Sequence, residues 1–199
     1  MLFFMKHTLL IFIILSFSAC KAQELFREYK FQSVKWTLRI PNNLYMEDSS
    51  LYESLKKNTI KKLDGNYDIS SFENITPLFV LQKGEGNYFG STINLYDSTL
   101  YSTWQKAYVN MQQGIINIIK SQGELINILD TSTSIEIIDK KIFKRFYIKT
   151  YYPSLKLTSN NYWFYRLHNN LDFSINVTYS DDKIGALFLK LLRESKFEE

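Results

Sequence analysis

Leu171-Asp172-Phe173-Ser174-Ile175-Asn176-Val177-Thr178-Tyr179 is the stretch that decides the fold. Apolar and polar side chains alternate along its whole length, which predicts a strand with one buried face and one polar face. Ser180 follows as a helix N-cap, with Asp181 and Asp182 where the helix dipole favours negative charge. A buried stripe that runs from Ile184 to Leu192 then predicts a closing helix. A strand followed directly by an amphipathic helix indicates a sheet with helices packed on it.

Most of the remaining strands are predicted to form hairpins with their neighbours in the sequence. Asn169-Asn170 is a two-residue link that tolerates positive φ, and it joins the strand above to the one before it. Asp139-Lys140-Lys141 and the glycine-containing segment 83–87 are further turn signals. Three pairs are predicted: 78–82 with 88–96, 133–138 with 142–152, and 162–168 with 171–179.

The rest of the chain is predicted to supply an opening strand and two more helices. The segment from Tyr29 to Ile40 alternates as an extended strand that ends at Pro41. Ser50 opens a possible capping box for a helix up to Leu63. A long helix with an apolar stripe from Leu100 to Ile119 is capped by Ser98 or Thr99 and ends before Gly123. The fold class is therefore α+β, with a mostly antiparallel sheet flanked by helices.

The N-terminus has the three-part layout of a secretory signal. Lys6 precedes an apolar run that is too short to span a bilayer, and the run ends at Phe17-Ser18-Ala19-Cys20. That ending resembles a bacterial lipoprotein processing site, apart from Phe17 where Leu is most usual. The resemblance implies an acylated Cys20 that anchors the chain in a membrane. We expect a signal peptide over 1–19, a tether over 20–28 and one domain over 29–199. Lys21 after the Cys, rather than Asp, favours the outer membrane of a bacterial envelope by resemblance to sorting rules.

Charge and residue inventory exclude several classes of function. The formal net charge is +4, and the basic residues are spread out rather than clustered, which argues against nucleic-acid binding. Cys20 is the sole cysteine, so the fold has no disulfide and no thiol nucleophile. His168 is the one histidine outside the signal, and it stands beside a predicted turn. We therefore expect no catalytic residue, no metal site and no cofactor.

Aromatic side chains offer the one candidate binding surface. Tyrosines and Trp163 gather on neighbouring predicted strands, and adjacent positions of a strand face opposite sides. Some of these rings must therefore lie on the second side of the sheet. There they either pack under a helix or line a groove or protein-binding patch, where Tyr and Trp are favoured anchors. The candidate residues are Tyr151, Tyr152, Tyr162, Trp163 and Tyr165.

The order of elements resembles that of the PsbP-like family, which includes the bacterial envelope lipoprotein DcrB. The resemblance covers 29–197 and is carried by three features. Val34 to Pro41 is a strand that runs into a proline, the middle hairpin precedes the long helix, and the closing helix ends in the segment from Leu191 to Phe197. It implies an αβα sandwich and a non-catalytic role in binding or assembly, although fold alone does not fix function.

Three hypotheses of function follow from the sequence. The first is a non-catalytic envelope lipoprotein that binds a protein partner or assists assembly, for instance as an immunity-type protein against a secreted toxin. The second is a lipoprotein that binds a small ligand or polysaccharide through its aromatic face. The third is a carboxylate-dependent hydrolase, which requires two acidic side chains about 5 to 10 Å apart in a cleft.

Overall fold

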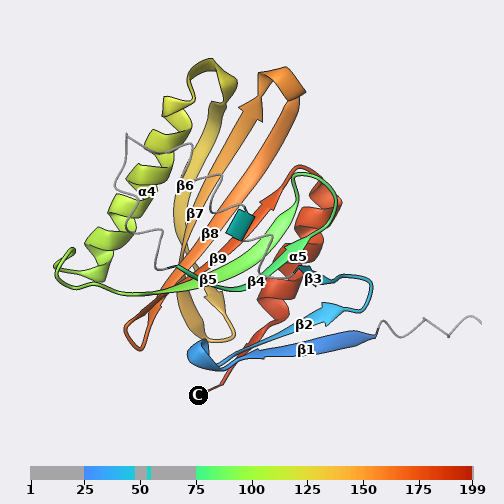
Figure 1. Ribbon diagram of the computed structural model, residues 1–199, viewed down its shortest axis with the longest axis vertical. Helices are drawn as coiled ribbons and strands as arrows, with labels where there is room; N and C mark the ends of the chain where they lie inside the picture. Colours follow the sequence, from blue (N-terminus) through green and yellow to red (C-terminus); the bar gives the residue numbers. More distant parts are fainter. Residues whose placement is uncertain (1–24, 48–52, 55–74, 199) are drawn as a thin grey trace, which may run out of the picture.

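A seven-stranded antiparallel sheet forms the centre of the molecule (Figure 1). The computed structural model describes residues 25–47, 53–54 and 75–198. The strand order is β3-β4-β5-β9-β8-β7-β6, and every neighbouring pair is antiparallel. The strands are β3 (Met46–Glu47), β4 (Thr76–Gln82), β5 (Tyr88–Leu95), β6 (Asn127–Ile138), β7 (Lys141–Tyr152), β8 (Leu157–His168) and β9 (Leu171–Tyr179). The α+β class predicted from the sequence is confirmed.

The two faces of this sheet carry different partners. Phe173, Ile175 and Val177 of β9 are fully buried on the inner face, as their alternation predicts. Helix α5 (Asp182–Glu194) covers part of that face, where the Phe188 ring lies 5.7 Å from the Phe89 ring. Helix α4 (Trp104–Ser121) lies on the outer face, where its Tyr108 contacts Tyr165. Helices therefore cover both sides of the sheet, as in the expected sandwich.

A second, three-stranded sheet closes the inner face below α5. Its order is β1-β2-β10, with β1 (Phe26–Phe31), β2 (Trp36–Pro41) and β10 (Lys196–Phe197). Trp36 is 1% exposed, and its Nε1 donates a hydrogen bond to Ser195 Oγ at 2.8 Å. Its ring lies 5.3 to 6.0 Å from four phenylalanine rings, namely Phe31, Phe79, Phe173 and Phe197. These contacts join the small sheet to the large one.

The opening segment is a hairpin, whereas the sequence predicts one extended strand over 29–40. The 3-10 helix η1 (Gln32–Val34) and Lys35, which has φ of 50°, turn the chain between β1 and β2. The turn contains neither glycine nor proline, so the apolar–polar alternation of the sequence gives no sign of it. The same connection recurs between β7 and β8, where η3 (Pro153–Leu155) precedes Lys156 at φ 49°. β1 starts at Phe26, so 26–28 belong to a strand and not to the predicted tether.

Turn residues fall where the sequence places them. Asp139 and Lys140 both have positive φ between β6 and β7, and Asn169 and Asn170 do so between β8 and β9. These values fit the two-residue hairpin turns that match strand twist. Strands β6 and β8 begin earlier than predicted, at Asn127 and Leu157, because pairing with β7 orders polar stretches that carry no strong strand signal.

The helix ends differ from the predicted ones by a few residues. Helix α4 starts at Trp104 and is capped by Thr103, not by Ser98 or Thr99, and the short 3-10 helix η2 (Gly123–Leu125) follows it. Helix α5 is capped by Asp181, whose carboxylate accepts from two backbone N–H groups. The backbone N–H of Ser180, the predicted cap, donates to the buried side chain of Asn87 instead. Of the predicted helix from Ser50 to Leu63, the structure describes Glu53 and Ser54, which are helical. The rest of that helix, like the signal segment and Cys20, lies outside the described residues.

The contact between α5 and β9 is close enough to exclude a side chain at Gly185. A Cβ atom there would lie 2.4 Å from two ring carbons of Tyr179. We expect Gly185→Ala to lower the free energy of unfolding by about 2 to 4 kcal/mol, because the helix or the ring must move. Urea unfolding measures this change.

Gly114 of α4 is the matched control, because a Cβ there meets nothing within 4 Å. Gly114→Ala is expected to raise the free energy of unfolding by up to about 1 kcal/mol through helix propensity. Equal effects of the two substitutions would contradict the close packing of α5 on β9.

Candidate binding surfaces

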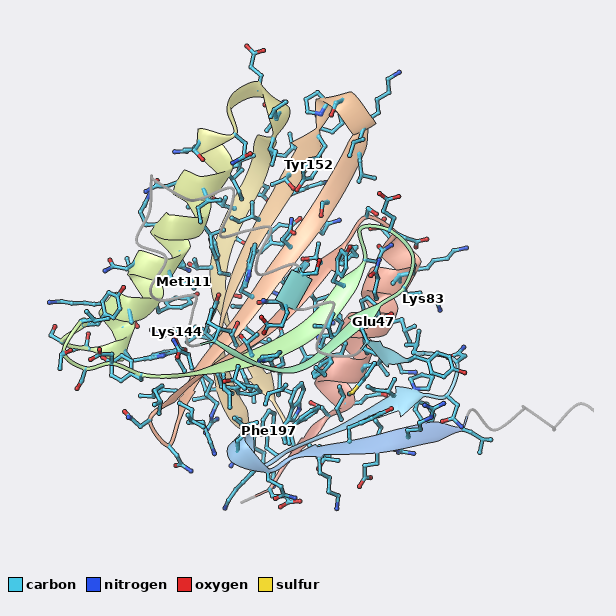
Figure 2. All side chains as sticks on the ribbon, viewed as in Figure 1. Glu47, Lys83, Met111, Lys144, Tyr152 and Phe197 are labelled. Carbon is cyan, nitrogen blue, oxygen red and sulfur yellow. The ribbon has the colours of Figure 1, made fainter. Side chains whose placement is uncertain are left out.

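The five predicted aromatic residues do not form one surface. In β8, Tyr162 packs against the inner-face core, whereas Trp163 and Tyr165 lie on the outer face. Tyr151 and Tyr152 end β7 and likewise face opposite sides. Figure 2 labels Tyr152 near the end of the sheet that lies away from Phe197. The expected alternation is therefore seen, and it splits the candidates between two separate sites.

Two of the outer-face candidates serve packing. Tyr165 is buried under α4, where its ring meets the Tyr108 ring edge-on at 5.7 Å. Trp163 stacks on the buried Phe146 at 5.8 Å. The sequence left two interpretations open for these rings, packing under a helix or lining a binding surface. Tyr165 packs under a helix.

A lysine and an aspartate complete the contact between α4 and the sheet. Lys144 Nζ lies 5.1 Å from the ring centres of both Trp104 and Tyr108 (its place under α4 is labelled in Figure 2). Trp104 Nε1 donates to Asp172 Oδ1 at 3.4 Å. Burial lowers the pKa of Lys144 and raises the pKa of Asp172, the latter against the hydrogen bond from Trp104. These groups hold the start of α4 to β7 and β9.

Beside α5, the inner face carries a cluster of three tyrosines, Tyr147, Tyr162 and Tyr179. The Tyr147 and Tyr162 ring centres lie 4.6 Å apart, and Tyr162 and Tyr179 lie 6.1 Å apart. The open space along α5 is about 630 Å³. It is lined by Tyr179, Asp182, Ala186, Leu189, Lys190, Arg193 and Glu194. Of the three tyrosines, Tyr179 alone lines this space; the predicted candidate Tyr162 is partly exposed, and the Arg145 guanidinium lies over its ring.

Helix length explains why this part of the inner face is open. Helix α5 has 13 residues, so it spans about 20 Å. Strands β6, β7 and β8 have 12 residues each, so they extend for about 40 Å. The helix therefore covers only part of their length. The alternation of β9 predicts that Tyr179 lies on the buried face. The glycine at position 185 of the closing helix was the signal in the sequence that α5 packs closely against that ring.

An isoleucine strip lies exposed at the edge of the sheet, and the sequence analysis did not single it out. Ile135 and Ile137 of β6 are each 68% exposed, and Ile142 of β7 is 60% exposed. Ile137 pairs directly with Ile142. Glu136, between the two β6 isoleucines, faces α5 and accepts from Arg193 at 2.8 Å. The isoleucines consequently share the outer face.

His168 ends β8 beside the Asn169-Asn170 turn, as predicted. Burial, together with the neighbouring Arg166, Lys35 and Lys141, lowers the pKa of its imidazole. Within the described residues, no group of three or more His, Cys, Asp or Glu side chains is placed to hold a metal ion.

Comparisons with known proteins show likeness to solved structures alone. No family model matches the chain, and no curated protein does. The chain is similar to the solution structure of cyanobacterial PsbP from Synechocystis, with 10% identity over 90% of this chain and 98% of that one, at a TM-score of 0.49. It is also similar to a Pseudomonas aeruginosa protein of unknown function described as a putative regulator. That likeness has 10% identity over 85% and 94% of the two chains, at a TM-score of 0.37. A PsbP is thus among the structural neighbours, as the sequence resemblance leads one to expect, but these values carry no argument about function.

Asp172 should make stability depend on pH in a definite direction. Its folded-state pKa lies above the ordinary value of 3.8, so ionisation at higher pH costs stability that protonation restores at lower pH. Asp172→Asn keeps an acceptor for Trp104 and carries no charge. We expect this substitution to raise the urea midpoint at pH 7. The gain over wild type should shrink as the pH falls towards and below 3.8, the ordinary pKa of an aspartate. A gain that is unchanged at low pH would show that burial of the charge is not its cause.

Proposed function

We propose that the chain is a non-catalytic, lipid-anchored protein of the bacterial envelope that binds a protein partner through the isoleucine strip. The observation that carries this proposal is the exposure of three isoleucines on one face of neighbouring strands. Exposed apolar clusters on folded domains mark interaction sites. Full burial of one such side chain is worth about 1.5 to 3 kcal/mol, so three provide the centre of a specific interface.

The edge of the sheet favours a partner that adds a strand. Among the described residues, β6 ends the strand order and so has one side without a paired strand. Natural edges are usually blocked by Lys, Pro or charges that point inward. The segment from Thr131 to Ile138 holds neither Lys nor Pro, and its one charge, Glu136, is bound by Arg145 and Arg193. An extended partner segment beside β6 would pair with its backbone and place apolar side chains against the strip.

The anchor is the second part of the proposal. Among the described residues, no helix is long and apolar enough to cross a membrane. Acylation of Cys20 would hold the domain at a membrane surface, and the outer membrane is the one we propose. An immunity-type protein that guards the envelope against a secreted toxin is one specific form of this function.

The anchor is tested by Cys20→Ser. This substitution removes the thiol that takes the lipid, so we expect the protein to move from the membrane to the soluble fraction of the envelope. Immunoblotting of separated fractions measures the shift, with Ser18→Ala as a control that leaves the thiol in place. Unchanged membrane association of the Cys20 variant would refute lipid anchoring.

The partner surface is tested by the double variant Ile135→Asp/Ile137→Asp. After cross-linking in cells, the intact lipoprotein should co-purify with an envelope protein, and the double variant should lose at least tenfold of it, because charge replaces the apolar contact. Leu155→Asp is the matched control, since Leu155 is also 68% exposed but lies in η3. Equal recovery by both variants, or no envelope protein recovered with wild type, would contradict the proposal.

A further inference from the structure

Two arginine–aromatic pairs lie at the start of the hairpin formed by β1 and β2. The Arg27 guanidinium carbon lies 5.0 Å from the centre of the Tyr45 ring, and that of Arg39 lies 5.1 Å from the centre of the Phe26 ring. Leu25 is 69% exposed, Tyr45 63% and Phe26 37%. We call these five residues the N-terminal patch. Figure 1 shows the start of β1 at the periphery of the molecule.

The hairpin holds the backbone of the patch in a defined place. β1 and β2 pair along their whole length, and the Asn42 N–H donates to the Leu25 carbonyl at 2.8 Å, which extends the pairing by one residue. Phe26 and Arg27 are neighbours in a strand and therefore point to opposite sides of it. One arginine–aromatic pair thus lies on each side of β1. A partner that touches both pairs must meet the end of the hairpin rather than either of its faces.

Positive charge is concentrated in this hairpin. Residues 25–45 hold four basic side chains and one acidic one, a net charge of +3 out of +4 for the chain. The acidic one, Glu28, stands opposite Arg39 in the strand register, but its carboxylate lies 3.6 Å from Lys30 Nζ. Among the described residues, no carboxylate lies within 4.0 Å of Arg27 or Arg39. Their planar guanidinium groups keep donors for an anion such as phosphate, which they bind with two parallel hydrogen bonds.

The composition of the patch fits the border between lipid headgroups and acyl chains. Aromatic rings settle at headgroup level, arginines bind the phosphates, and exposed leucines reach the acyl chains. Five residues separate Phe26 from Cys20, so the lipid anchor proposed above would hold the patch beside the bilayer. The same side chains also suit a protein partner, and it is the position next to the anchor that favours the membrane.

The isoleucine strip lies at the other end of β2. Asp139, which follows the strip residues of β6, accepts hydrogen bonds from Lys196 Nζ and from the Phe197 N–H of β10. β10 pairs with Trp36 and Thr37, the first residues of β2, whereas β1 starts opposite the last one. β2 has six residues, so its two ends lie about 17 Å apart. Contact of the patch with a membrane therefore does not cover the strip.

We propose that the N-terminal patch docks on a bilayer that contains anionic phospholipid. Arg27 and Arg39 bind headgroup phosphates, and Leu25, Phe26 and Tyr45 lie at the border of the acyl chains. This inference rests on the proposed lipid anchor and deepens it. The anchor holds the domain at the membrane, and the patch sets which end of the domain faces the lipid.

The test places a fluorescent reporter beside the patch and measures its contact with lipid. The full chain with Asn43→Cys is labelled with bimane and reconstituted in vesicles of phosphatidylethanolamine and phosphatidylglycerol that contain nitroxide-labelled lipid. Asn43 is exposed, lies two residues from Tyr45 and takes no part in the arginine–aromatic pairs. We expect quenching at least threefold stronger than from Leu155→Cys. Leu155 is 68% exposed, but it lies in η3, at the end of β7 away from Asp139.

Charge reversal separates docking from simple tethering. Arg27→Glu/Arg39→Glu should lower the quenching at position 43 to the level at position 155, because the charge now repels anionic lipid while the tether is unchanged. Lys106→Glu/Lys183→Glu is the matched control. It makes the same change of net charge at exposed positions in the first turns of α4 and α5, where glutamate suits the helix dipole. With the patch intact, 500 mM salt should remove at least half of the quenching, and this readout needs no substitution in the patch.

The outcomes distinguish this inference from the anchor. Equal quenching at positions 43 and 155, or quenching at 43 that neither charge reversal nor salt reduces, would overturn the docking of the patch and leave the anchor intact. An acylated Cys20 has no free thiol, so the chain without an engineered cysteine should take no bimane. Labelling of that chain would count against the anchor alone, and the same quenching measured in a Cys20→Ser background would then decide whether the patch docks.

Discussion

The burial of Trp36 is the constraint on which the arrangement of both sheets depends. Its indole is enclosed by four phenylalanine rings, from β1, β4, β9 and β10, and its N–H is satisfied by Ser195 just after α5. A buried indole N–H without an acceptor is costly, so the end of α5 has to lie where Ser195 can reach. Helix α5 is thus fixed at this end by Trp36 and at its start by Asn87, and these contacts set the position of the open space along it.

Much of the fold was predictable, because period-two alternation and turn chemistry are local signals. The alternation of β9 and the Asn169-Asn170 turn gave the central hairpin in its observed register. The turn at Lys35 was missed, because lysine seldom adopts positive φ and only the paired strands hold it there. Alternation also predicted that the aromatic candidates divide between two faces. Which of them stay open depends on where α5 lies. Contacts such as Gly185 on Tyr179 set that position, and the alternation of the strands does not encode it.

The two faces of the sheet are covered by their helices in different ways, and each leaves a different kind of side chain exposed. On the outer face, α4 is held by aromatic stacking and by Lys144, and Ile135, Ile137 and Ile142 remain exposed towards the edge. On the inner face, α5 buries the core residues beside it and leaves tyrosines beyond it partly exposed. Tyrosine suits that border, because its ring packs while its hydroxyl stays hydrated. A single domain without a disulfide thus keeps two chemically different surfaces available.

The start of β1 at Phe26 has a consequence for how the domain moves. If Cys20 holds the lipid, five residues separate it from the first strand, and Cys20 and Phe26 then lie at most about 20 Å apart even when the chain between them is fully extended. A domain of this size has a radius of gyration of about 15 Å, so the segment that tethers it is shorter than the diameter of the domain. The domain would therefore stay at the membrane surface and meet its ligands by diffusion in two dimensions. Such confinement raises the local concentration of anything else fixed to that surface, which makes weak contacts sufficient.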